Sequence, residues 1–460
     1  MHYDELLRRM EAGMSNQVPA DDKDAFTIAR LPPHVREASR RLYEPTVVSI
    51  GPYHMSSAST RTSQADKWRM LREFLRRGDP DGKAGLLAAC IKAVRGMEPR
   101  ARRCYGENPE VRGDDLVHLF VLDGCFILQF LLEWSESRTR YCIMRGPSIY
   151  VYYDLLLVEN QMPFFVLAKL FSLVMGSAAA AAMEDMVVDQ RLLHLIFGFF
   201  SLREPLNQVP APIPAGPQFT EAYHLLHLQY QRIVMTPEHR KLRRLTRLGT
   251  SLYSIPTGIA SFVRKRVTGT MTPLAIPCVT ALQDEFGVTF REKLSPDSQF
   301  DVTFSGGTME IPRLVINGGT RILLANLFAL EQTKDCWSEG TMTGYLVLMN
   351  ALVNTGADVA VLQRRGIMDN MLSNEEEAAA FFNQLGGSAL FDPRTHRYAQ
   401  LFKDTNEYCN SQWNRYMAVL KRDHLRTPCS IINLLVAAIL LFVSVMSVGY
   451  LICRYRHACT

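Results

Sequence analysis

The chain has 460 residues, of which 47% are apolar and 21% are charged, so it is long and apolar enough to bury a sizeable core. This composition excludes a disordered or fibrous protein. The net charge of +5 is too small for this length to indicate nucleic-acid binding by itself. The 10 cysteines form no C-x-x-C pair and no zinc-finger spacing, which predicts reduced thiols and no metal site.

The N-terminal segment, residues 1–42, is polar, and we expect it to be loosely attached. It begins with the charged stretch MHYDELLRRMEAG and has no long apolar run, so no secretory signal is visible. A first helical block is predicted over residues 43–204. One face of a helix in this block carries four apolar residues, which are Trp68, Leu71, Phe74 and Leu75.

Two further helices are predicted in the first block. Phe120–Trp134 has the composition of a buried helix, which we expect to be interrupted at Asp123 and Gly124. Pro163–Met183 is long enough to span a membrane, but it carries Lys169, and a central lysine costs roughly 2.5–3.5 kcal/mol on insertion. We therefore interpret Pro163–Met183 as a buried core helix.

Residues 205–272 are predicted to form a proline-rich linker and a basic segment. Pro205–Phe219 contains five prolines, which favours an extended linker. The basic run at 239–247 could meet anionic lipid or nucleic acid, although a solvated helix face is the more common explanation. His224 and His227 lie one helical turn apart and could form half of a metal site, but no acidic or cysteine partner is near, which favours a core or surface pair.

A second helical block is predicted over residues 273–425. Phe300–Ile316 alternates in polarity and turns at Gly306 and Gly307, which predicts a small β-hairpin. Apolar and aromatic residues then recur at helical spacing over Tyr398–His424, which predicts one long amphipathic helix. We favour a stalk packed on the body for this helix, and docking of a partner on its aromatic face is the alternative.

Helix ends in the second block are predicted from capping residues. Asp358 is expected to cap one helix and Gly366 to stop it. Ser373 and Glu376 have the spacing of a capping box ahead of the following helix. The chain as a whole is therefore predicted to be mostly α, or α+β with a small β-hairpin, with one additional transmembrane helix near its C-terminus.

The membrane segment is predicted within residues 426–460. Ile431–Cys453 has 23 residues and no charge, and as a helix it would be about 35 Å long, enough for a hydrocarbon core of roughly 30 Å. Basic residues are in excess on its N-terminal side, which predicts a body in the cytosol and a tail-anchored, single-pass protein. The flanking arginines are Arg422, Arg426, Arg454 and Arg456.

No nucleotide-binding, hydrolase, kinase, zinc-protease or EF-hand motif is present, so the sequence predicts neither an enzyme nor a cofactor. Polar residues lie within three apolar segments, where they must find hydrogen-bond partners. We interpret them as a structural polar network of Ser49, Tyr53, His54, Asp123, Asp154, Glu159, Asn160, Gln161, Asn326, Glu331 and Gln332. The alternative is an enzyme of unknown class in which Tyr53, His54 and Glu159 are acid or base groups.

Nine motifs are distributed over most of the chain: VSIGPYH (48–54), DKWRML (66–71), LDGCFILQFL (122–131), DLLLVENQMPFFVL (154–167), FGVTFR (286–291), IPRLVI (311–316), NLFALEQ (326–332), DVAVLQRRGIM (358–368) and RTPCSIINLLVAAILL (426–441). In order and spacing they resemble the plant DUF247 family, also called UPF0481. This chain departs from the family pattern at Gln64-Ala65-Asp66, where an acidic residue and a histidine usually precede the KWR element, at Ala325 in place of arginine, and at Cys429 in place of tryptophan.

The resemblance implies a plant protein associated with the plasma membrane, in a family without an established biochemical activity. Some members in grasses are implicated as pollen determinants of self-incompatibility, so the resemblance implies recognition or signalling at the membrane. The expected partners are membrane lipid and an unknown protein, and no nucleic acid is expected. Nothing in the residues themselves indicates a role in pollen.

Overall fold

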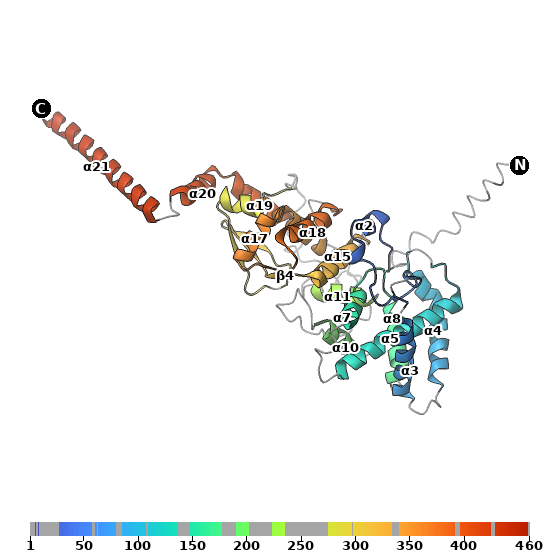
Figure 1. Cartoon of the computed structure of the whole chain (residues 1–460). Helices are drawn as coiled ribbons and strands as arrows, with labels where there is room; N and C mark the ends of the chain where they lie inside the picture. Colours follow the sequence, from blue (N-terminus) through green and yellow to red (C-terminus); the bar gives the residue numbers. More distant parts are fainter. Residues whose placement is uncertain are drawn as a thin grey trace, which may run out of the picture. The chain divides into compact units, whose positions relative to one another are not determined.

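The computed structural model divides into two compact units (Figure 1). Unit 1 comprises Met1–Arg247 and Asn317–Trp337, and unit 2 comprises Leu248–Ile316 and Ser338–Thr460. Part of the predicted second block, around residues 317–337, therefore belongs to unit 1. The residues that the structure describes are 5, 8, 27–57, 60–61, 63–79, 85–106, 109–136, 147–176, 190–201, 223–234, 275–296, 298–333, 340–391, 396–424 and 428–458.

Unit 1 is built from helices around one central, apolar helix, α5. This helix packs against α3, α4, α8 and α10, because most of its side chains are apolar and buried. The described helices of the unit are α2 (Pro33–Ala38), η1 (Arg40–Leu42), α3 (Ser63–Gly78), α4 (Leu86–Arg103), α5 (Gly113–Glu136), α7 (Pro147–Asp154), α8 (Phe164–Met175), α10 (Gln190–Ser201), α11 (Leu225–Ile233) and α15 (Gly318–Gln332).

The expected interruption of the central helix is wrong, because α5 continues through Asp123 and Gly124. Gly124 is needed for packing, since a side chain there would collide with Leu170 and approach Met162. Among the helices whose side chains the structure describes throughout, α5 is long and apolar enough to cross a membrane, but 83% of its apolar window is buried inside the protein. Such burial is typical of a core helix.

Two other sequence predictions in unit 1 have opposite outcomes. The interpretation of Pro163–Met183 as a core helix is confirmed for Phe164–Met175, which forms the buried helix α8, and residues 177–183 lie outside the described chain. The expected apolar face of α3 is partly wrong. Trp68 is 48% exposed, and the fully buried Lys67 joins Leu71 and Phe74 on the inner face instead.

The end of the N-terminal segment is more tightly held than the sequence predicts. Ile28 and Leu31 are buried, and Ile28 forms a β-bridge with Tyr105 of unit 1. The amide of Ile28 also donates a hydrogen bond to the carbonyl of Cys104 at 2.8 Å. Residues 27–42 are therefore part of the folded unit, because their few apolar side chains reach its core.

The described part of unit 2 contains two small sheets. The predicted hairpin is confirmed as β2 (Thr303–Ser305) antiparallel to β3 (Thr308–Ile311), joined at Gly306 and Gly307, whose φ angles of +55° and +76° suit glycine. A strand that the sequence pattern did not predict, β1 (Thr289–Glu292), pairs parallel with β3 and gives the order β1-β3-β2. The second sheet pairs β4 (Leu314–Ile316) parallel with β5 (Met368–Asn370).

The described helices of unit 2 include α14 (Val279–Asp284), α16 (Thr341–Leu352), α17 (Gly356–Arg364) and α18 (Glu375–Gly387). Helix α17 packs on β5, α14 and α18, and α16 packs on α18. Gly366, with φ +72°, follows the end of α17, as predicted. The cap of α17 is Thr355, and Asp358 completes its capping box from the third position. The capping box predicted from Ser373 is wrong by one residue, because Asn374 accepts the amide of Glu377 at 2.8 Å.

The prediction of one long helix over Tyr398–His424 is wrong, because the helix is interrupted at Ser411, whose backbone is extended. It forms α19 (Ala399–Asn410) and α20 (Gln412–His424). The last helix, α21 (Pro428–Ala458), has 31 residues, and its Leu435–Tyr450 stretch is a shorter apolar segment. The described chain confirms the prediction of a mostly helical fold.

Candidate functional site

The predicted polar residues surround an irregular stretch of unit 1, residues 46–51. This stretch is neither helix nor strand, so its buried amides need side-chain acceptors. Asp154, at the end of α7, provides three such bonds: its Oδ1 accepts from the amide of Thr46 at 2.8 Å, and its Oδ2 accepts from the amides of Val47 and Val48 at 2.7 and 2.8 Å. Burial raises the pKa of Asp154, and these amides partly offset that effect.

Asn160 continues the same pattern from the loop before α8. Its Oδ1 accepts from the amide of Ile50 at 2.7 Å, and its Nδ2 donates to the carbonyls of Val48 and Asp154 at 3.0 and 2.9 Å. The amide group thus satisfies a donor and two acceptors at once. Gly51 follows with φ +70°, and a side chain there would collide with the carbonyl of Gln161.

A fully buried ion pair joins α3 to α5 beneath this stretch. The ammonium of Lys67 lies 2.5 Å from Asp123 Oδ1, and both side chains are 0% exposed. Lys67 also donates to the carbonyl of Ser49 at 2.5 Å, and Asp123 Oδ2 accepts the amide of Gly51 at 2.9 Å. Burial raises the pKa of Asp123, and Lys67 opposes that shift.

Sequence reasoning missed Lys67 as a member of the network. The signal for it was present, because Lys67 lies three, four and seven residues before Met70, Leu71 and Phe74, on the apolar face of α3. A lysine on such a face must pair with an acid, and Asp123 lies on the equally apolar α5.

Glu159 forms a second ionic cluster with the N-terminal segment. Its Oε1 accepts from the amide of Leu31 at 2.6 Å and from the guanidinium of Arg36 at 2.5 Å. Its Oε2 lies 3.4 Å from His54 Nε2. Burial opposes ionisation of Glu159, but these donors outweigh it and hold its pKa below the usual value.

Tyr53 lies against the N-terminal segment beside this cluster. Its hydroxyl lies 3.4 Å from the carbonyl of Ile28, and its ring meets Tyr105 edge-on at 5.3 Å between centroids. The guanidinium of Arg30 lies 4.8 Å from the centre of the Tyr53 ring. The structure thus places Tyr53 and His54 beside the same N-terminal segment that Glu159 holds.

The remaining predicted residues connect α15 and α11 to the loop before α8. Gln161 donates to the carbonyls of Leu155 and Leu157 at 2.8 Å. Asn326 of α15 accepts the amide of Val158 at 2.8 Å and donates to the carbonyl of Leu42 at 2.8 Å.

At the far end of α15, Glu331 accepts the hydroxyl of Tyr230 at 2.5 Å. Gln332, the last residue of α15, is half-buried. The three apolar segments predicted to carry the network therefore all lie in unit 1.

The two histidines considered as half of a metal site have other roles. His224 caps α11, because its Nδ1 accepts the amide of His227 at 3.2 Å while its Nε2 lies 3.1 Å from the carbonyl of Thr27. The ring of His227 stacks on Tyr223 at 4.6 Å. Within the described ranges, no group of three histidine, cysteine or acidic residues has a metal-binding arrangement.

The arginines predicted to flank the membrane segment are only partly described. Arg422 donates to the carbonyl of Asp284 at 3.3 Å within unit 2. Arg426 lies outside the described residues, and Arg454 and Arg456 belong to α21. The basic run at 239–247 also lies outside the described residues.

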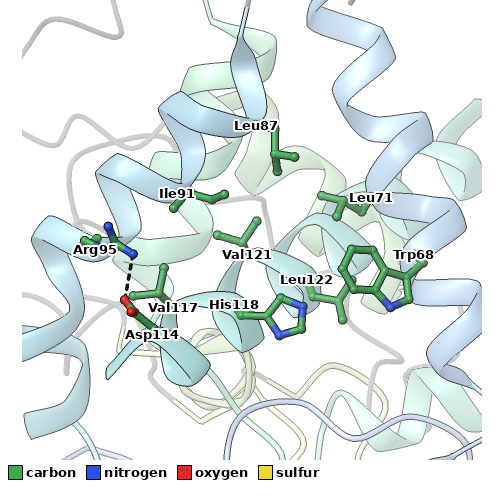
Figure 2. Close-up of a pocket in the computed structure, with 10 residues that line it drawn as sticks. All are labelled: Trp68, Leu71, Leu87, Ile91, Arg95, Asp114, Val117, His118, Val121 and Leu122. Atoms are coloured by element: carbon green, nitrogen blue, oxygen red, sulfur yellow. Dashed lines mark hydrogen bonds and ion pairs between the residues drawn. The ribbon is translucent and has the colours of Figure 1, made fainter. Parts of the chain in front are cut away.

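A cavity of about 260 Å³ opens between α3, α4 and α5 on unit 1 (Figure 2). Its walls are apolar, and Trp68 and Leu87 are exposed beside it, at 48% and 44%. The Trp68 ring lies 5.4 Å from the His118 ring, and an Arg95–Asp114 ion pair of 2.8 Å lies at the opposite end (Figure 2). The other lining residues are Leu71, Ile91, Val117, Val121 and Leu122.

Fold and site together define a two-unit, mostly helical protein in which buried carboxylates, amides and a lysine hold irregular segments in place. The family model for DUF247, described as a plant protein of unknown function, matches residues 28–443, and the chain belongs to this family. The predicted resemblance is therefore confirmed. The motifs that carried it supply the residues of the network, Lys67 and Asp123 included.

The chain is also similar to two proteins of Arabidopsis thaliana. It is 28% identical over 423 residues to UPF0481 protein At3g47200, covering 89% of this chain and 83% of that protein. It is 23% identical over 469 residues to putative UPF0481 protein At3g02645, covering 87% of this chain and 85% of that protein. No solved structure matches the chain.

Proposed function

We propose that this chain is a membrane-anchored recognition protein, with α21 as its transmembrane anchor and its body on the cytosolic side. The observation that carries the proposal is α21 itself, a helix of 31 residues whose side chains over Leu435–Tyr450 are exposed. At 1.5 Å per residue the helix is about 46 Å long, more than a hydrocarbon core of roughly 30 Å.

The exposed apolar surface of α21 supports a lipid environment. Contact with water costs about 25 cal/mol for each Å² of apolar surface, so a helix with apolar side chains on all sides needs a cover. The uncharged run Ile431–Cys453 has the length of a span, and basic residues are in excess before it. The resemblance stated above supports the plasma membrane as the location.

Fractionation of cells that express the full chain tests the anchor. The full chain is expected in the membrane pellet and resistant to alkaline extraction, whereas a chain lacking residues 427–460 is expected in the soluble fraction. Retention of the shortened chain in alkali-resistant membranes would contradict the proposal. A matched control with residues 431–453 replaced by an unrelated span of equal length is expected to return to the pellet.

The recognition part of the proposal rests on the cavity of unit 1. Its volume of about 260 Å³ lies below the roughly 300–1,000 Å³ of small-molecule sites, and it suits an apolar side chain of a protein partner. An exposed tryptophan beside an apolar cavity has the character of an interface hot spot. The Arg95–Asp114 pair would lie at the polar rim of such an interface.

Proximity labelling from the full chain in its own cells tests this surface. Leu87→Asp places a charge at the mouth of the cavity and is expected to remove a defined set of labelled proteins. Leu390→Asp, at an 83% exposed site in unit 2, is the matched control and is expected to leave that set unchanged. Identical labelling by both variants would contradict recognition through the cavity.

An enzyme is the second candidate, and one observation favours it. His54 Nε2 lies 3.4 Å from the buried carboxylate of Glu159, an arrangement that can serve acid–base chemistry. However, both oxygens of Glu159 already face donors from the N-terminal segment and His54, and such contacts indicate a structural role. In addition, neither Glu159 nor His54 lines the cavity. Turnover of an ester, phosphate or glycoside substrate that His54→Ala abolishes would favour the enzyme.

A further inference from the structure

The helix just before the proposed anchor has an unusual exposed face. On α20, Trp413 is 71% exposed, Tyr416 is 69% exposed and Val419 is 41% exposed. These residues are spaced by three, so they share the outward half of the helix. Large aromatic side chains at this exposure are expected to find a cover in the working protein.

The opposite face of α20 is fixed to unit 2. Ala418 is buried against Gly287, where an added Cβ would lie 3.0 Å from the Cβ of Ala418. The guanidinium of Arg415 lies 5.4 Å from the centre of the Phe286 ring, and Arg422 donates to the carbonyl of Asp284 at 3.3 Å. These contacts hold the helix in one rotation, so the aromatic side chains stay on the outside.

Charge is arranged along the border of this exposed half. With about 100° of rotation per residue, Arg415 and Arg422 lie between Val419 and the buried Ala418, where they contact unit 2 and are still exposed to solvent, and Trp413 and Tyr416 lie on the other side of the exposed half. The helix carries three basic residues against one acidic residue, Asp423. It therefore presents an aromatic edge beside a basic edge.

The bilayer interface matches this chemistry. Tryptophan and tyrosine prefer the headgroup level, where their rings meet lipid and their polar atoms meet water. Basic side chains next to them are attracted to the anionic lipids of the cytosolic leaflet. A helix with both features lies in the plane of the interface.

The position of α20 in the chain also indicates that lipid headgroups cover its exposed face. His424 ends α20 and Pro428 begins α21. Four residues span at most about 14 Å, so the end of α20 stays close to the level at which α21 enters the bilayer. A protein partner or a second copy of the chain would have to fit into the headgroup layer to reach this face.

We propose that α20 is an interfacial helix that inserts Trp413 and Tyr416 among anionic headgroups and holds unit 2 against the membrane surface. This inference rests on the proposed function, because it takes α21 as the span. It goes beyond that function, since it assigns a lipid-binding surface to the folded body as well as to the anchor.

Quenching of tryptophan fluorescence by brominated lipids tests the inference on the full chain. The protein is reconstituted in vesicles of phosphatidylcholine and phosphatidylserine, with or without bromine on the acyl chains near the headgroup. The chain has 4 tryptophans, so the contribution of Trp413 is obtained by comparison with Trp413→Phe. Bromine is expected to quench the wild-type emission, and Trp413→Phe is expected to lose most of that quenching.

Trp68→Phe is the matched control, because Trp68 is exposed on unit 1 and is expected to contribute little of the quenched emission. A second variant, Val419→Asp, places a charge within the exposed face and is expected to reduce the quenching while the protein resists alkaline extraction. Trp413 and Val419 both lie outside the inner face of α20 that packs on unit 2.

Alkaline extraction of the same vesicles distinguishes failure of the α21 anchor from failure of the interfacial position of α20. If the protein resists extraction but wild type and Trp413→Phe are quenched equally, α20 does not lie in the interface and the inference is overturned while the anchor stands. Blue-shifted emission from Trp413 without bromine quenching would indicate a protein cover and would also overturn it. Release of the chain by alkali would overturn the anchor and this inference together.

Discussion

Unit 1 buries charged and amide side chains, which in most proteins face water. In contrast, α20 and α21 of unit 2 expose apolar side chains, which in most proteins lie in the core. In unit 1, Lys67 and Asp123 are fully buried and face each other and the backbone. In unit 2, Trp413 and the apolar side chains of α21 have no comparable cover in the described chain. The two regions depart from the usual distribution of side chains in opposite directions.

The difference shows which requirements are met inside the chain and which are left to its surroundings. A buried polar group must be paired within the fold, and unit 1 provides the pairs through bonds between distant segments. An exposed apolar surface must be covered from outside, and α20 and α21 offer such a surface next to one another in sequence. The network residues of unit 1 thus find their polar partners within the fold, whereas the end of unit 2 exposes apolar surface that a lipid or protein neighbour would cover.

The largest expected effect tests the polar side of this comparison. Lys67→Met removes the ammonium and leaves Asp123 buried without its ionic partner, which should destabilise the fold by about 3–5 kcal/mol. The measurement is denaturant unfolding of the protein in detergent micelles. Lys92→Met, at an exposed lysine of α4, is the matched control and should change stability by less than about 0.5 kcal/mol. Similar stability of the two variants would show that the buried pair does not hold α3 to α5.

A smaller effect is expected where one carboxylate serves several amides. Asp154→Asn replaces one oxygen by an NH₂ group that faces amide donors, so at least one buried amide loses its acceptor, at a cost of about 1–3 kcal/mol. Unfolding of this variant is compared with that of Asp115→Asn, at an exposed aspartate of α5. An unchanged midpoint for Asp154→Asn would mean that the stretch 46–51 is held in another way.

The smallest of the three effects depends on pH. The pKa of Glu159 is held below its usual value, so its ionised form stabilises the fold above the ordinary glutamate pKa of about 4.3, and this contribution is lost as pH falls through the lower pKa of the folded state. Glu159→Gln should reduce stability at neutral pH by about 1–2 kcal/mol, since Arg36 is partly exposed to solvent.

The measurement is the difference in unfolding free energy between wild type and Glu159→Gln from pH 7 down to about pH 3. That difference should shrink as the pH falls, because protonation of Glu159 makes the wild type resemble the variant. Asp123 and Asp154, whose pKa values are raised by burial, change stability in the opposite sense but are present in both proteins. A difference that stays constant with pH would contradict the ionic role of Glu159.

Sequence reasoning was most successful where a feature is local. The β2–β3 hairpin was predicted because Gly306 and Gly307 form its turn within the same short segment. Strand β1 was missed because its parallel partner β3 lies 19 residues further along the chain, and no local pattern records that pairing. The break at Ser411 was missed because apolar spacing continues on both sides of it.

The polar network was also predicted only where the signal is local. Its members within apolar segments, such as Asp154 and Asn160, were visible because buried polar groups need partners. Lys67 was missed because apolar residues alone were used to define the inner face of α3, which placed Trp68 on that face. Its partner Asp123 is 56 residues further along the chain. Their pairing depends on how α3 packs on α5, which the sequence pattern alone does not specify.

The central claim is that α21 crosses the membrane and leaves the body in the cytosol, and protease protection in intact microsomes tests it most directly. The full chain carries one epitope after Thr460 and another in the region 235–250, and the microsomes are treated with protease before and after detergent. The account predicts that the epitope after Thr460 is protected until detergent is added while the body is digested at once. Digestion of both epitopes in intact microsomes, or protection of the body, would contradict it.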